Sequence, residues 1–81
     1  MNQEQNETAG GTAEMEAERQ KIVSFIEDAK EEIERLSAEI ERLTPFDHDV
    51  KVYRRIKRLN TAREIMQEYV ILLKTELQGH E

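Results

Sequence analysis

An uninterrupted heptad of apolar residues runs through the first half of this chain. Its members are spaced alternately four and three residues apart: Ile22, Ile26, Ala29, Ile33, Leu36, Ile40 and Leu43. A repeat of 3.5 residues keeps one face of an α-helix turned toward a neighbouring helix. The heptad therefore predicts a helix, expected over residues 12–43, that packs lengthwise against another helix.

Polar residues and glycines set the expected limits of this helix. Residues 1–11 are almost entirely polar and end in Gly10 and Gly11, so we expect a flexible N-terminal tail. Pro45 lacks an amide hydrogen and should end the helix. The run Thr44-Pro45-Phe46-Asp47 has a capping-box pattern, and Asp47 and Asp49 are competing N-caps. We therefore expect a turn at residues 44–49, a second helix over residues 50–78 with Gly79 as its left-handed end, and a short tail at residues 79–81.

The second helix has its own apolar seam, and the stripe around that seam is wide. The seam consists of Val52, Ile56, Leu59, Met66, Val70, Leu73 and Leu77, with Arg63 in one core position. The flanks carry Tyr53, Ala62, Ile65, Tyr69 and Leu72. A short connection favours antiparallel neighbours, and a wide stripe exceeds what one partner helix covers. The predicted fold is all-α: an antiparallel two-helix hairpin that oligomerises into a helical bundle, although Ile at a with Leu at d also suits parallel pairing of first helices between copies.

The residues predicted to form the oligomer interface come from both helices. They are Ile26, Ile33, Ile40, Ile56, Leu59, Arg63, Met66, Tyr69, Val70 and Leu73. The apolar run 69–73 exceeds one helix face, so it is either the centre of this interface or a docking surface for another protein. Arg63 has two interpretations: its stem extends to solvent, or it pairs with an acid across the interface and fixes the register.

Charge divides unevenly between the two helices. Residues 1–43 hold twelve acids and five bases, and residues 44–81 hold six acids and seven bases, within an overall net charge of −6. No acid occurs between Lys51 and Arg63. This basic stretch either neutralises the acidic first helix or captures an anionic ligand. The second interpretation uses Lys51, Tyr53, Arg54, Arg55, Lys57 and Arg58, with Tyr53 positioned to stack on a base or sugar.

The residue types present argue against an enzyme. The chain has no Cys, no Ser–His pair with an orienting acid and no Gly-rich phosphate loop, so we expect no catalytic residues and no cofactor. Asp47, His48 and Asp49 are better explained as turn and cap residues than as metal ligands, and we expect no metal site. The chain also has no signal-peptide pattern and no apolar run that could cross a membrane, so we expect a cytoplasmic protein.

The order of elements resembles one known group of proteins. An apolar helix, a Pro-containing turn with acids, and a basic helix reading RRIKRLNTAREIM are similar in layout, over residues 33–77, to small helical phage proteins that sequester cyclic nucleotide signals of bacterial immunity. The resemblance carries over no individual site residue. It implies a compact oligomer that binds an anionic ligand between protomers.

Two functions follow as expectations. The first is a non-enzymatic interaction protein that forms a homo-oligomer and binds a partner protein. The alternative is a sponge for a small anionic nucleotide, or a binder of short nucleic acid, that uses the basic stretch. A net charge of −6 disfavours long duplex DNA as a ligand.

Overall fold

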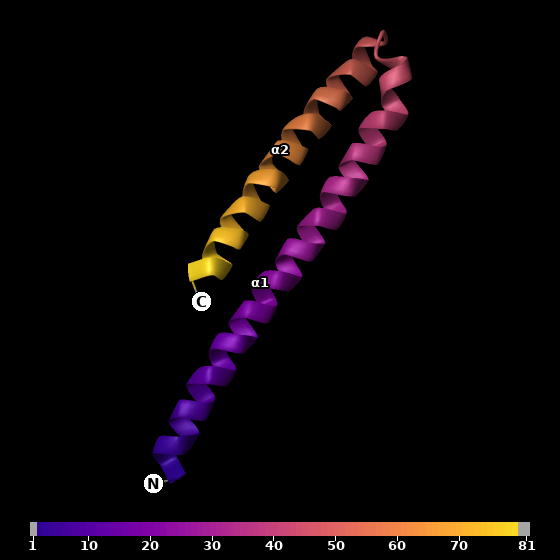
Figure 1. Cartoon of the computed structure of the whole chain (residues 1–81). Helices are drawn as coiled ribbons and strands as arrows, with labels where there is room; N and C mark the ends of the chain where they lie inside the picture. The colour runs from indigo at the N-terminus through magenta and orange to yellow at the C-terminus, as the bar shows by residue number, and fades with distance from the viewer. Residues whose placement is uncertain (1, 80–81) are drawn as a thin grey trace.

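Two long helices packed lengthwise make up almost all of the chain in this computed structural model, which describes residues 2–79 and their side chains from residue 13 onward (Figure 1). Helix α1 spans Asn2–Leu43, a 3₁₀ turn η1 spans Thr44–Phe46, and helix α2 spans Val50–Gly79. Residues near the turn face each other, as Glu39 faces Arg55, and residues far from it do so too, as Ile22 meets Leu73. The chain is therefore an all-α helical hairpin.

The seam between the helices follows the heptads. Ile22, Ile26, Ala29, Ile40, Val70 and Leu73 are buried, and Ile33, Met66 and Leu77 pack against them partly buried. The best-buried cluster lies away from the turn, and Ala29 at its centre is only 2% exposed. A small side chain at that position lets the two helices approach closely.

Helix α1 ends at Leu43 as expected, but it starts earlier than expected. The helix begins at Asn2 rather than at Thr12, so residues 2–11 are helical where a flexible tail was expected. Gln, Glu and Ala favour a helix, and their propensity outweighs a cost of about 1 kcal/mol for each of Gly10 and Gly11. As a result α1 extends well beyond the end of α2 (Figure 1).

The residues of the expected capping box form the turn, but through other contacts than those of a capping box. The Thr44 hydroxyl donates to the carbonyl of Ile40 at 2.6 Å, and the amide of Asp47 donates to the carbonyl of Thr44 at 3.1 Å. Asp49 is the N-cap of α2, because its Oδ1 accepts from the Lys51 amide at 2.8 Å. The N-cap of α2 is therefore Asp49 and not Thr44, because Pro45 lies in a 3₁₀ turn instead of starting the helix.

The other end of α2 also differs from the expectation. Gly79 is the last residue of the helix and has no positive φ, so it is not the left-handed end that was predicted. Of the tail expected at residues 79–81, the last two lie outside the described residues.

Candidate interaction surfaces

Most of the residues predicted for an oligomer interface lie between the two helices of one chain. Ile26, Ile40, Val70 and Leu73 are buried, and Ile33, Ile56, Leu59, Arg63 and Met66 are half-buried, whereas Tyr69 is 41% exposed. Packing within the hairpin already uses nearly all of this set. A surface for another molecule must be sought among the apolar side chains outside the seam.

Such side chains form a stripe along one side of α2. Ala62, Ile65, Tyr69 and Leu72, here called the outer stripe, follow one another at intervals of three and four residues. Ile65 is 59% exposed and Leu72 is 67% exposed, although both are large and aliphatic. Helical geometry places these positions on one face, displaced from the seam. The outer stripe is therefore an apolar surface along α2 whose large side chains, Ile65, Tyr69 and Leu72, remain exposed in the described part of the hairpin.

Phe25 of α1 extends this surface across the gap between the helices. It is 48% exposed and borders the same shallow groove as Tyr69. The groove is lined by Glu18, Lys21, Ile22, Phe25, Tyr69, Leu73 and Glu76. The sequence analysis did not single out Phe25, because its position beside Tyr69 depends on how the two helices are aligned.

The basic stretch lies on the outside of α2 near the turn. Within the described part of the chain, only Arg55 of this stretch forms an ion pair with α1, to Glu39 at 3.4 Å. Lys51, Arg54 and Arg58 are exposed and form no ion pair there. Neutralisation by the acidic helix thus involves a small part of the basic stretch.

Two of the predicted ligand residues contact each other instead. The Lys57 ammonium lies 5.5 Å from the centroid of the Tyr53 ring, within the range of a cation–π contact. Tyr53 is 48% exposed, so one face of its ring stays open to solvent. A stacking role for Tyr53 would use that open face.

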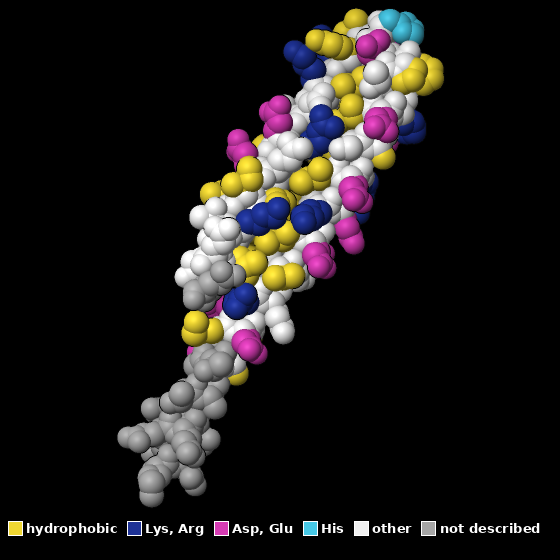
Figure 2. All heavy atoms as spheres, in the orientation of Figure 1, with side chains coloured by type: hydrophobic (Ala, Val, Ile, Leu, Met, Phe, Trp, Pro, Cys, Tyr) yellow, Lys and Arg dark blue, Asp and Glu magenta, His cyan; other side chains and the backbone are white. Residues whose placement is uncertain are grey.

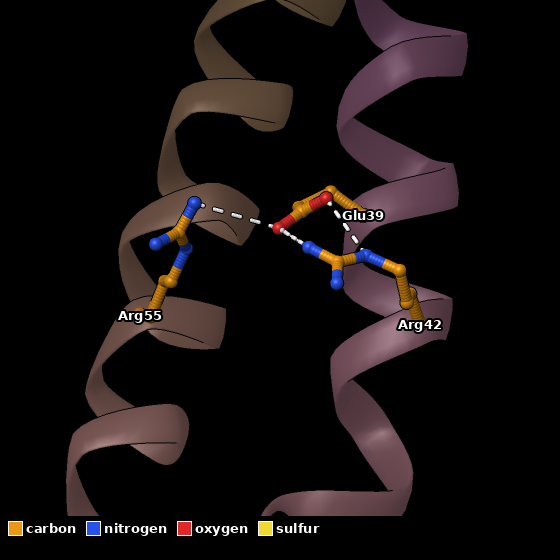
Figure 3. A network of polar contacts seen from close by, with 3 residues as sticks. All are labelled: Glu39, Arg42 and Arg55. Atoms are coloured by element: carbon orange, nitrogen blue, oxygen red, sulfur yellow. Dashed lines mark hydrogen bonds and ion pairs between the residues drawn. The ribbon is translucent and has the colours of Figure 1, made fainter.

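Glu39 is the centre of the polar network that links the helices near the turn. Figure 3 shows its carboxylate between Arg42 and Arg55, with Arg42 contacting both oxygens. Arg42 Nε donates to Oε2 at 3.2 Å, and its Nη2 donates to Oε1. The hydrogen bonds from Arg42 lower the pKa of Glu39, partial burial opposes this shift, and the charges of Arg42 and Arg55 add to it. The carboxylate is therefore held in its charged form.

Arg63 crosses the seam to a neutral partner. Its Nη1 donates to the Ser37 hydroxyl on α1 at 3.3 Å, and its Nη2 donates to Asn60 Oδ1 at 2.8 Å. Within the described residues of the hairpin Arg63 forms no ion pair, because the residue of α1 that meets it is a serine. An ion pair across an interface between copies stays a prediction. Ser37 was missed in the sequence, since only the alignment of the helices brings it to Arg63. Asn60 was also missed, although it lies three residues before Arg63 on α2 and i,i+3 spacing places it beside Arg63.

The described surface contains neither a metal cluster nor a membrane-spanning segment. Over the residues whose side chains are placed, His, Asp and Glu do not gather in groups of three or more that could hold a metal ion. In the same part of the chain, neither helix combines the length and apolarity needed to cross a bilayer. Figure 2 shows where side chains gather on one face instead: hydrophobic groups along the line between the helices, Lys and Arg across that line, and acids mostly along α1 with some along α2.

Comparisons of the chain with protein-family models, curated proteins and solved structures find no match. The fold and its surfaces define the chain as an elongated helical hairpin with one apolar and one basic outer surface.

Proposed function

We propose that this chain is a non-enzymatic interaction protein whose antiparallel hairpin binds other helices, those of a second copy and of a partner protein. The observation that carries the proposal is the outer stripe. Its large apolar side chains are exposed while the seam of the same hairpin is already filled. A contiguous exposed apolar surface is typical of an interaction site.

The size of the surface suits helix-to-helix binding. Fully burying a side chain such as Ile or Leu contributes about 1.5–3 kcal/mol. Ile65, Tyr69 and Leu72 together with Phe25 therefore offer several kcal/mol, enough to offset part of the cost of association. The spacing of three and four residues along α2 is the spacing that a partner helix covers.

The test changes the outer stripe without touching the seam. We expect the double variant Ile65→Gln, Leu72→Gln to keep the helical circular dichroism of the parent and to sediment as a smaller species. The matched control is Ile71→Gln, because Ile71 is 63% exposed but lies outside the stripe. If the double variant and the parent have equal mass at every concentration, the outer stripe is not an association surface.

The basic stretch supports a second candidate function, capture of a phosphate-bearing ligand. The specific observation is that Lys51, Arg54 and Arg58 are exposed and without ion pairs in the described part of the chain. One guanidinium group can bind two oxygens of a phosphate at once, and cations without ion-pair partners attract an anionic ligand over a longer range. The layout resemblance to phage proteins that sequester cyclic nucleotides is consistent with this candidate.

A thermal-shift series tests the second candidate with cyclic di-AMP, ATP and inorganic phosphate as probes. A ligand present at a hundred times its dissociation constant stabilises by about 2.7 kcal/mol. We expect a rise in melting temperature that disappears in Lys51→Gln, Arg54→Gln and in high salt, but persists in the control Lys74→Gln. No shift with any probe would remove this candidate and leave the first unaffected.

A further inference from the structure

The outer stripe carries a second heptad on α2, bounded by opposite charges. From Arg58 through Ala62, Ile65, Tyr69 and Leu72 to Glu76, the spacing is four, three, four, three and four residues. Arg58 and Glu76 are exposed, as are the three large apolar residues between them. The stripe thus has the repeat of a coiled-coil seam, separate from the seam that closes the hairpin.

This pattern is its own complement when it is inverted about Gln67. Positions 58 and 76, 62 and 72, and 65 and 69 are equally distant from residue 67. Two helices that pair in opposite directions therefore bring Arg58 to Glu76, Ala62 to Leu72 and Ile65 to Tyr69. A cation meets an anion, and a small side chain meets a large one, in both halves of the contact.

Pairing in the same direction gives none of these matches. It places Arg58 against Arg58 and Glu76 against Glu76, and like charges at close positions repel. It also sets Ala62 against Ala62, which leaves space between the helices. The residues at the ends of the stripe therefore select the inverted arrangement.

The exposed area of one copy is larger than that of a compact protein of the same size. A compact monomer of 9.5 kDa exposes about 5,000 Å², whereas this chain exposes 6746 Å². A standard interface takes about 800 Å² from each partner. A second copy can thus cover an interface of ordinary size and still leave the first residue of the basic stretch, Lys51 near the turn, open.

We propose that two copies associate through the outer stripes of their α2 helices in opposite directions, with Arg58 of each copy paired to Glu76 of the other. Arg58 and Glu76 lie about 27 Å apart along the helix at 1.5 Å per residue, so the two ion pairs bracket the apolar contact. This inference rests on the proposed function and adds the identity of the partner, the contacting helix and its register.

Charge exchange tests the register. In sedimentation equilibrium at low salt, Arg58→Glu and Glu76→Arg alone are expected to raise the dissociation constant about tenfold, because each creates two like-charge contacts. The double variant Arg58→Glu, Glu76→Arg should restore it, as should an equimolar mixture of the two single variants, whose heterodimer has both pairs attractive. The matched controls are Lys74→Glu and Glu64→Arg, which carry the same charge changes on exposed positions of α2 away from the stripe.

Cross-linking provides a second readout that does not depend on charge. The chain has no cysteine, so Ala62→Cys, Leu72→Cys introduces the only thiols. Mild oxidation should yield a covalent dimer whose linked peptides join position 62 to position 72. Links of 62 to 62 and 72 to 72 would overturn the inverted register, as would single charge reversals that behave like their controls.

The experiments distinguish failure of the proposed function from failure of the proposed register. If Ile65→Gln, Leu72→Gln leaves the mass unchanged, the outer stripe has no role in association and both proposals fall. If that variant dissociates while charge exchange and cross-linking give no support for inversion, association through the stripe stands and the register is wrong.

Discussion

At the scale of single residues, polar side chains at the seam link the two aligned helices. Arg63 interrupts an otherwise apolar series on α2 and holds Ser37 and Asn60 at 3.3 and 2.8 Å. Glu39 holds Arg42 and Arg55 nearer the turn. The Arg63 guanidinium donates to neutral oxygens, whereas Glu39 forms ion pairs with arginines, so the two sets of contacts respond differently to substitution and to pH.

Replacing Arg63 with leucine tests whether its hydrogen bonds outweigh an apolar contact. We expect Arg63→Leu to raise the unfolding free energy by about 1 kcal/mol, because replacing a polar side chain inside a seam by an apolar one often stabilises the fold. This gain corresponds to a rise of about 4–8 °C in melting temperature. Arg54→Leu, on the exposed surface, serves as the control and should stay within about 0.5 kcal/mol. A lower melting temperature for Arg63→Leu would show that the link to Ser37 is the stronger contribution.

Glu39 should make stability depend on pH in the acid range. Its pKa is lowered in the folded chain, first by hydrogen bonds from Arg42. The stabilisation is therefore complete above the pKa of the unfolded chain and is lost as the pH falls through the lower, folded value. We expect melting temperatures measured from pH 7 to pH 3 to fall less steeply for Glu39→Gln than for the parent. Glu34→Gln, exposed and outside the network, should follow the parent curve.

At the scale of helices and turns, spacing within one helix was predictable and alignment between helices was not. The heptads identified the buried face of α1 and α2, because a repeat of 3.5 residues is a property of one segment. The start of α1 at Asn2 was missed, since glycines normally weaken a helix. Ser37 beside Arg63 and Phe25 beside Tyr69 depend on the register between helices, which the turn geometry sets. The outer stripe was visible only as flanking residues, and its exposure required the packed hairpin.

The cap of α2 gives a prediction at this scale. Asp49→Ala removes the acceptor of the Lys51 amide, so we expect a loss of about 1 kcal/mol in unfolding free energy by urea titration. Asp49→Asn keeps an acceptor oxygen and should lose less. Asp47→Ala is the matched control, because Asp47 joins the turn through its backbone amide. Equal losses for Asp47→Ala and Asp49→Ala would mean that turn charge, rather than capping, stabilises this end.

At the scale of the whole molecule, the hairpin is long and thin. One face of α2 is buried against α1, and the face that carries the outer stripe is exposed. Its radius of gyration is 19.7 Å, against about 12 Å for a compact domain of this length. The buried cluster between the helices lies toward the open end, and the outer stripe runs along the same part of α2. Folding and the proposed association therefore use adjacent residues that point in different directions.

Leu72 and Leu73 separate these two roles with the same substitution. Leu73 is 7% exposed and belongs to the buried cluster, whereas Leu72 is 67% exposed on the outer stripe. We expect Leu73→Ala to cost about 2–5 kcal/mol and to lower helicity and melting temperature sharply. Leu72→Ala should keep the helicity and weaken self-association in sedimentation. If Leu72→Ala unfolds the chain as Leu73→Ala does, the hairpin has no stable fold apart from its association, and seam and stripe form one core shared between copies.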